Sequence, residues 1–509
     1  MRHRSTVVGG ALAACLLLTV PASAATPTPG SAGIGDPYLP DSGNGGYDVS
    51  HYDLRLQYRP RTDRLDGTAT LLATATQDLS RFDLDFVLDV QEVLVDGKRA
   101  AFAKAGAHEL QVTPRTPLSK GRPFTVVVRY GDVPSEKKVD GHSAWSRTPD
   151  GAVVAGEPAA AAWWFPSNDH PRDKATYDIS VAVPEGLQTV SNGILSSRST
   201  QRGWTRYTWR STKPQATYLA TLAVGKFEIA QGTTSNGLPV INAYSKDLGD
   251  GLAPAKASIE RTGEVIDWAS TLFGPYPFEA AGGYVPNLPG RGALETQTRP
   301  VYASGTFQNG AFMEVVVHEL AHQWFGDSVS VRNWRDTWLS EGFATYAEWL
   351  WSEKEGEGTA RELADYAYAS QPADDPFWKV RPADPGKDNP LHNAVYLRGA
   401  MALQALREKI GDSTFFTVLK EWQKQRRHGN ATVEDFTRLA QDVSGKSLRR
   451  LFDTWLYTPG KPAQGPGAAG GKNGIAQAAQ PVQPKSWKNL ERARLSHRHR
   501  PELTGADRS

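Results

Sequence analysis

The chain has 509 residues, a length that predicts two or three domains of roughly 100–200 residues each. Hydrophobic residues make up 39% of it and charged residues 22%, so most of the chain is able to bury a core. The formal net charge is only +2, and the basic residues are dispersed rather than clustered, so the sequence gives no reason to expect a nucleic-acid partner.

The first 24 residues are typical of a secretory signal peptide. Arg2 and Arg4 supply a basic start, residues 7–20 an apolar stretch, and Ala22-Ser23-Ala24 a small-x-small cleavage site. We expect cleavage near Ala24 and a secreted mature protein with no membrane span. The only cysteine, Cys15, lies inside the apolar stretch rather than at its end, which argues against a lipoprotein cleavage box.

A β-rich part follows a short leader. Residues 25–45 are rich in Pro, Gly and Ser and predict a flexible leader. Apolar residues then alternate with polar ones in 52–58 and 82–90, and further β-rich runs lie at 124–130, 177–183 and 218–224. We interpret residues 46–230 as an all-β domain.

Helical patterns dominate the next part of the chain. They cover 253–272, 314–324, 337–353 and 395–410, with Gly- and Pro-rich loops between them. We interpret 231–459 as a mixed but mainly helical domain. From Gly460 the composition shifts to Gly, Ala, Gln and Pro and then to scattered Arg and His, which predicts a disordered tail over 460–509.

The strongest chemical signal is an H-E-x-x-H motif, formed by His318, Glu319 and His322. Residues four apart project from one face of a helix, so both imidazoles are able to reach a single cation. Glu341 follows His322 by 19 residues on a second predicted helix. Two imidazoles and one carboxylate suit zinc, and a catalytic site keeps the fourth position for water. Glu319 occupies the usual place of a general base.

These motifs resemble those of the gluzincin aminopeptidases of the aminopeptidase N and leukotriene-hydrolase type. The family signature is H-E-x-x-H, an 18-residue gap and Glu, and the likeness extends over nearly all of 46–459. The resemblance implies an α+β multidomain fold, with an N-terminal saddle-like β-sandwich followed by a thermolysin-like, mainly α catalytic domain. It also implies a zinc aminopeptidase with one Zn²⁺ per chain, acting on peptides with a free amino terminus.

The resemblance also assigns residues that bind the substrate. Gly292-Ala293-Leu294-Glu295 stands where the family has its exopeptidase motif, with Leu for the usual Met and Thr296 for the usual Asn. It implies that Glu295 binds the α-ammonium of the substrate, with Gly292 and Ala293 as further substrate-binding residues. By its spacing from the Pro-rich segment near Pro166, Glu157 is implied as a second amine anchor.

Tyr396 matches the catalytic tyrosine of the family. It is followed by Arg398 and Gly399, and Arg398 stands where the family usually has Lys. Its hydroxyl is implied to donate to the oxyanion, and Glu319 to take a proton from the attacking water. Full-length relatives also carry a large C-terminal helical domain over the active site. Only about fifty residues follow Gly460 here, so we expect a more open cleft without the carboxylate-binding groups of that domain.

Three questions stay open on the sequence alone. Asp336 and Glu348 are both acidic residues near the metal-binding segments, and nothing in the sequence decides which one orients a ligand. A thermolysin-like endopeptidase would share the metal and the base but would not need Glu295. A non-catalytic protein that retains only the scaffold is the other alternative, against which the complete set of His, Glu and Tyr argues.

Overall fold

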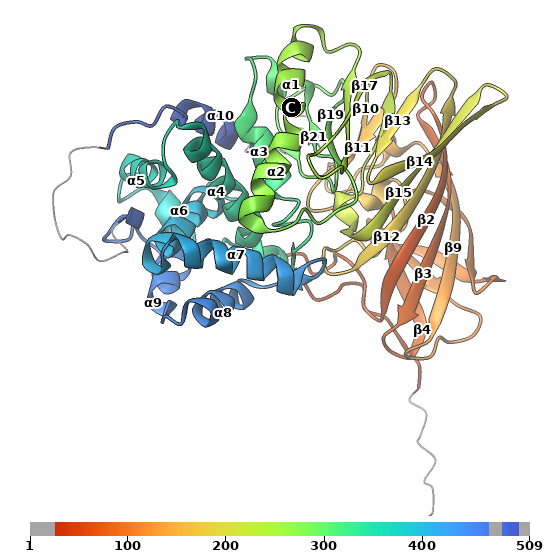
Figure 1. Cartoon of the computed structure of the whole chain (residues 1–509). Coiled ribbons are helices and arrows are strands. Elements are labelled where there is room, and N and C mark those ends of the chain that lie inside the picture. The colour runs from red at the N-terminus through yellow and green to blue at the C-terminus, as the bar shows by residue number, and fades with distance from the viewer. Residues whose placement is uncertain (1–25, 468–480, 498–509) are drawn as a thin grey trace, which may run out of the picture.

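The computed structural model describes residues 26–467 and 481–497 of the chain. A β-rich part formed by the first half of the chain lies beside a mainly helical part formed by the second half (Figure 1). The predicted fold class is therefore confirmed. The signal-like segment and Cys15 lie outside the described residues.

The largest element of the β-rich part is an eight-stranded sheet. The sheet is mixed, because β12 runs parallel to β2 and antiparallel to β15. Alternate residues of β2, among them Tyr52, Leu54 and Leu56, are buried, as the period of two predicts. In spatial order the strands are β14 (Ile194–Gln201), β15 (Trp204–Ala216), β12 (Lys174–Pro184), β2 (Tyr47–Arg59), β3 (Arg64–Ala75), β9 (Pro123–Asp132), β5 (Val90–Val95) and β6 (Lys98–Arg99).

Two four-stranded sheets complete the β-rich part. One core of buried side chains joins their inner faces to the large sheet, and it includes Tyr52, Phe82, Tyr130 and Trp164. The first sheet consists of β1 (Thr28–Pro29), β4 (Leu79–Asp85), β8 (Glu109–Thr113) and β7 (Ala101–Ala105). The second consists of β10 (Trp145–Arg147), β11 (Ala152–Val154), β16 (Leu222–Gly225) and β13 (Gln188–Ser191).

The boundary that the sequence predicts at residue 230 falls inside a strand. Residues on both sides of it belong to β17, which pairs antiparallel with β18 and so belongs to the sheet of the second part. That sheet consists of β17 (Phe227–Thr233), β18 (Pro239–Ser245), β19 (Ala281–Val285), β21 (Val301–Tyr302) and β20 (Ala293–Leu294). A short parallel pair, β22 (Ser330–Val331) and β23 (Asn430–Ala431), lies apart from it.

Among the described residues, three of the four predicted helical ranges coincide closely with single α-helices, and five further α-helices lie outside the predicted ranges. The pattern over 253–272 predicts one helix, but the structure has two, because Thr262 begins a new helix and its hydroxyl donates to the carbonyl of Ile259 over 2.6 Å. The helices are α1 (Leu252–Ile259), α2 (Thr262–Phe273), α3 (Met313–Ala321), α4 (Trp338–Glu355), α5 (Ala360–Ser370), α6 (Asn393–Ile410), α7 (Asp412–Arg426), α8 (Val433–Ser444), α9 (Arg449–Phe452) and α10 (Trp487–His497).

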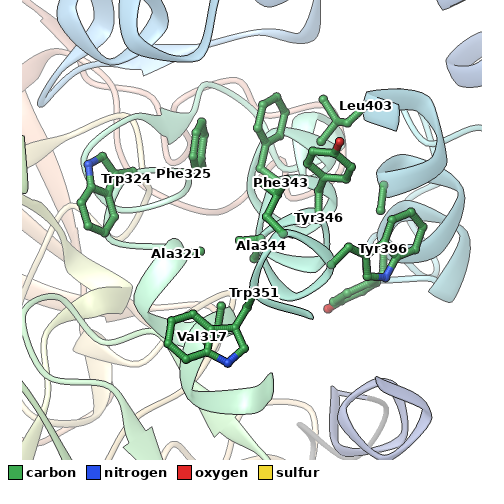
Figure 2. Close-up of a cluster of buried hydrophobic side chains, with 14 of the residues drawn as sticks. Val317, Ala321, Trp324, Phe325, Phe343, Ala344, Tyr346, Trp351, Tyr396 and Leu403 are labelled. Carbon is green, nitrogen blue, oxygen red and sulfur yellow. The ribbon is translucent and has the colours of Figure 1, made fainter. Parts of the chain in front are cut away.

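Helices α3, α4 and α6 form the centre of this part. Figure 2 shows Val317 and Ala321 of α3, Phe343 of α4 and Leu403 of α6 within one cluster of buried side chains. Glycines allow α4 and α6 to approach closely, since a Cβ on Gly399 would lie 3.2 Å from the Cα of Gly342. This approach sets the position of Tyr396, one turn before Gly399, relative to α4. Among the described residues, no helix is both long and apolar enough to cross a bilayer.

The leader is ordered where the structure describes it, so the predicted flexibility of 25–45 is wrong for 26–45. The carboxylate of Asp36 is buried and accepts from the ring of His170 at 3.0 Å and the backbone N–H of Trp334 at 2.8 Å. The hydroxyl of Tyr38 donates to Asp384 over 2.6 Å. The leader therefore bridges the two parts of the molecule, and its polar composition reflects these bonds rather than disorder.

The tail also differs from the prediction, because α10 packs against the helical part. Trp487, Leu490 and Ala493 lie on one face of α10 and are buried. The side chain of Asn489 donates to Glu314 of α3 over 3.1 Å. Disorder over the whole of 460–509 is therefore wrong, since three apolar residues at helical spacing provide a docking face within a mostly polar segment.

We expect Leu490→Ala to weaken the docking of α10 by about 2–5 kcal/mol, because it leaves a cavity under the helix. The measurement is amide hydrogen exchange, in which the amides of α10 lose protection while those of α3 and α4 keep theirs. Leu495→Ala is the matched control, because Leu495 is 47% exposed on the same helix. Equal protection of α10 in the two variants would contradict this account.

Candidate metal centre and active site

Three predicted ligand residues meet at the contact between α3 and α4. His318 lies on α3, His322 directly follows its last residue, and Glu341 lies in the first turn of α4. Oε2 of Glu341 is 3.2 Å from Nε2 of His318 and 3.4 Å from Nε2 of His322. All three residues are buried. The helical spacing of four residues therefore does place both imidazoles toward one carboxylate.

This arrangement fits a divalent metal ion. Ligand atoms bound to a tetrahedral zinc at its usual bond lengths lie about 3.3–3.5 Å from one another, close to the two distances at Glu341. The centre also carries excess negative charge. Burial lowers the pKa of His322, but the carboxylates of Glu341, Glu295 and Glu319 outweigh this and raise it to about 10. A cation held between the three ligands would relieve this charge.

The remaining imidazole nitrogens have partners that fix the rings. Nδ1 of His318 donates to Oε1 of Glu348, about two turns further along α4 than Glu341, over 2.6 Å. Nδ1 of His322 donates to the carbonyl of Phe325 over 3.0 Å. Asp336 instead accepts from Asn333 and from the backbone N–H of Val433. Glu348, and not Asp336, is therefore the acidic residue that orients a ligand, a question that the sequence left open.

We expect Glu348→Ala to lower the affinity for the bound metal about 10–100-fold, because partners of this kind orient the ligand and raise its basicity. The measurement is competition with a chromogenic chelator. Asp336→Asn is the control, since Asp336 bonds to groups outside the centre, and it should leave the metal affinity unchanged. Equal losses in the two variants would show that Glu348 acts only through folding.

Two carboxylates lie beside the metal ligands. Single oxygens of Glu295 and Glu319 and a ring nitrogen of His322 all lie within 4.8 Å of one another. Glu295 and Glu319 are both fully buried. The structure therefore brings the predicted base and the predicted amine anchor to the same side of the centre, one from α3 and one from the loop after β20.

Gln323 and Tyr218 hold the loop that carries Glu295, and neither residue was predicted from the sequence. The amide of Gln323 donates to the carbonyl of Glu295 over 3.1 Å and accepts from the N–H of Thr298 at 2.7 Å. The hydroxyl of Tyr218 lies 3.4 Å from Oε1 of Glu295. Gln323 directly follows the H-E-x-x-H motif, so its position in the sequence could have indicated a role at the site. Tyr218 lies 77 residues from Glu295, and no local sequence pattern connects the two.

Glu157 comes from the β-rich part and is half-buried. Burial raises the pKa of Tyr218 well above its usual range, and the charges of Glu295 and then Glu157 raise it further. Tyr218 therefore lies close to both predicted amine anchors, which come from opposite parts of the chain. The roles of Glu157 and Glu295 remain predictions.

Ala293 begins β20 at the edge of the five-stranded sheet, and Gly292 directly precedes it. Strand β20 is the last strand in the order and pairs only with β21 within the described sheet. Gly292 has φ +132°, a conformation that favours glycine, and its N–H donates to Thr306. An edge strand beside the ligands is able to pair with an extended peptide, which agrees with the substrate-binding role expected of these residues.

Tyr396 lies on α6, and its ring stacks on the ring of His318 with centroids 6.2 Å apart. The Arg that replaces the usual Lys two residues later has a structural role. Arg398 is buried and donates to the backbone carbonyls of Trp378 over 2.8 Å and Thr454 over 3.0 Å. Tyr396 and Glu348 also line a small cavity with Leu490 and Arg494 of α10. The tail helix therefore borders the Tyr396 side of the site.

The chain matches two domains of one peptidase family in their order along the sequence. Residues 49–219 match the peptidase M1 N-terminal domain, and residues 299–455 match the peptidase family M1 domain. The second match contains the H-E-x-x-H motif, Glu341 and Tyr396.

Curated relatives are longer than this chain. Glutamyl aminopeptidase of Sus scrofa is 29% identical over 336 residues, which are 61% of this chain and 35% of that protein. Tricorn protease-interacting factor F2 of Thermoplasma acidophilum is 27% identical over 362 residues, 65% of this chain and 44% of that protein. The chain thus spans less than half the length of these relatives.

Solved structures of similar length also match. An M1 zinc metallopeptidase from Deinococcus radiodurans is 30% identical with a TM-score of 0.74, and the match covers 84% of this chain and 98% of that one. A mutant M1 zinc metallopeptidase from the same organism, bound to a Tyr-Ser-Ala substrate, is 29% identical with a TM-score of 0.73, covering 84% and 99%. Since both domains match in order and a solved structure matches over almost its whole length, this chain belongs to peptidase family M1.

Proposed function

We propose that this protein is a zinc-dependent aminopeptidase that removes the first residue from peptides with a free amino terminus. His318, His322 and Glu341 would hold the zinc, and their separations and burial support this assignment. The names of the relatives agree with it, since they include a glutamyl aminopeptidase and an M1 zinc metallopeptidase.

The residues around the ligands supply the acid–base and electrostatic parts of the reaction. A zinc ion held by His318, His322 and Glu341 would supply Lewis-acid chemistry, which makes water a stronger nucleophile near neutral pH. Glu319 accepts the proton of the attacking water and then delivers it to the departing amine. The hydroxyl of Tyr396 donates a hydrogen bond to the oxyanion that develops on the peptide carbonyl oxygen.

The position of Glu295 is the observation that favours an aminopeptidase over an endopeptidase. Its carboxylate is buried within 4.8 Å of oxygen and nitrogen atoms of Glu319 and His322. A buried carboxylate gains a charge-assisted hydrogen bond from an α-ammonium that a blocked amine does not provide. An ammonium held by Glu295, with Glu157 as the second anchor, leaves only the first peptide bond within reach of Glu319.

Paired peptides test this proposal. Purified protein with zinc is given a set of short peptides and the same peptides N-acetylated, and the released amino acids are identified. We expect release of the first residue from the free-amine set alone. Cleavage of both sets at internal bonds would overturn the aminopeptidase assignment in favour of an endopeptidase, and zinc binding without hydrolysis of either set would favour a non-catalytic scaffold.

Replacing the anchor gives a second test on the protein itself. We expect Glu295→Gln to lower kcat/KM for free-amine peptides by about 10–100-fold, because the charge-assisted bond to the ammonium becomes a neutral one. Glu279→Gln, an exchange at a carboxylate that accepts from the backbone of Thr212, is the matched control. Equal rates for Glu295→Gln and the wild-type protein would rule out Glu295 as the amine anchor.

We further propose that the protein is secreted after cleavage near Ala24. The support is the sequence of residues 1–24, with a basic start, an apolar stretch and a small-x-small site. Expression of the whole chain in a bacterial host with a secretion pathway should release a product whose amino-terminal residue is Ala25. Retention of the uncleaved chain inside the cell would contradict this proposal.

A further inference from the structure

A second group of metal-binding side chains lies in the β-rich part, in the four-stranded sheet formed by β1, β4, β8 and β7. Asp85 ends β4 and pairs with Glu109, the first residue of the antiparallel β8. His108 precedes Glu109, and its Nε2 lies 3.6 Å from Oδ1 of Asp85 and 3.7 Å from Oε1 of Glu109. One ligand atom from each of the three residues lies within 4.8 Å of the other two. The strand register thus brings one imidazole and two carboxylates to a single point.

The carboxylate of Glu109 points into this group without a hydrogen bond of its own. The residue is 8% exposed, and both of its side-chain oxygens are buried and have no hydrogen-bond partner among the described residues. Oδ2 of Asp85, in contrast, accepts from Asn44 over 2.9 Å and from the backbone N–H of Asp169 over 2.8 Å. This leaves Oδ1 of Asp85 facing His108. Burying a carboxylate without a hydrogen-bond donor costs free energy, and a bound cation would supply the missing electrostatic partner.

The group also holds more acidic than basic residues. Burial, followed by the charge of Asp83, raises the pKa of Glu109 to about 8. Burial, followed by the charge of Glu109, raises the pKa of Asp85 well above its usual range. Protons or a cation must therefore neutralise these carboxylates when the protein is folded.

The donor set indicates which cations suit the group. One imidazole nitrogen and two carboxylate oxygens match zinc or manganese, whereas calcium and magnesium prefer sets made only of oxygen. Nε2 of His108 donates to the backbone oxygen of Asp41 over 3.1 Å, and once an ion replaces that proton, this oxygen offers a fourth ligand atom. His108 is 27% exposed at its side chain, so an ion is able to reach the group from solvent.

We propose that Asp85, His108 and Glu109 form a second metal site that binds zinc or manganese, separate from the centre at His318. The ion would connect β4 and β8 to the leader, since Asp41 and Asn44 both contact this group. A chain with a single cysteine forms no internal disulfide, so a metal ion here would cross-link segments that nothing else ties covalently.

Metal counting tests the proposal on the whole protein. Wild type and variants are saturated with zinc, dialysed against metal-free buffer and analysed by mass spectrometry for bound metal. We expect two zinc ions in the wild type, one in Glu341→Ala, one in Glu109→Gln and none in the double variant. The same series in manganese should show the ion at the second site retained in Glu341→Ala and lost in the double variant.

Two controls separate this result from misfolding and from failure of the proposed function. Glu92→Gln changes an acidic residue of β5 that is ion-paired with Arg99 and Arg129, and it should keep both ions. His108→Gln, at a partly exposed position, should lose the same single ion as Glu109→Gln. Any hydrolytic activity should stay within about twofold of wild type in both variants. Equal metal content in wild type, Glu109→Gln and His108→Gln would overturn the second site, whatever the activity shows.

Discussion

Glu319→Gln is expected to lower kcat about 10²–10⁴-fold, the usual contribution of a general acid–base residue. The amide keeps the shape of the side chain but takes no proton from water. Because Glu319 is not among the three ligand residues, whose separations suit a metal without it, the variant should retain its zinc. The measurement is steady-state hydrolysis of a dipeptide substrate together with metal content by mass spectrometry.

A matched exchange on the same helix controls for changes in α3. Glu314 lies in the first turn of α3, one turn before His318, and accepts from Asn489 of α10. Glu314→Gln should therefore leave kcat within about threefold of wild type, as expected for a change outside the reacting groups. If Glu319→Gln binds zinc and keeps near wild-type turnover, Glu319 is not the base and the proposed mechanism fails.

Tyr396→Phe is expected to lower kcat about 10²–10³-fold with little change in KM, because the lost hydroxyl stabilises the transition state rather than the bound substrate. The ring stacks on that of His318 and lines a cavity with α10, and Phe preserves both contacts. Metal content and thermal stability should therefore match the wild type. Initial rates over a range of substrate concentrations separate kcat from KM.

Tyr346→Phe serves as the comparison for this exchange. Tyr346 is buried on α4 and donates to Gln404 of α6 over 2.7 Å, so its hydroxyl has a structural partner away from the ligands. We expect a stability loss of about 1 kcal/mol and unchanged kcat. A rise in KM at constant kcat in Tyr396→Phe would show that Tyr396 binds substrate and does not stabilise the oxyanion.

Short-range patterns in the sequence were sufficient to predict the elements that carry the centre. The four-residue spacing of His318 and His322 places both on one face of a helix, since that spacing depends only on the geometry of the helix. The alternation in 52–58 predicted β2 because alternate residues of a strand at a core face the same side. The spacing after His322 pointed to Glu341, and the resemblance to a family then supplied Glu295 and Tyr396. These residues lie on separate elements that the structure brings together at the centre.

Only the tertiary structure decided which groups support these residues. Asp336 and Glu348 are both acidic and both lie within seven residues of Glu341, and the direction of α4 past α3 brings Glu348 to His318. The leader and α10 were misjudged for the same reason, because their few buried groups, such as Asp36 and Leu490, are buried against distant segments of the chain. The composition of a segment indicates only how much apolar surface the segment can bury by itself. The free energy that orders the leader and α10 comes from contacts with residues far away in the chain.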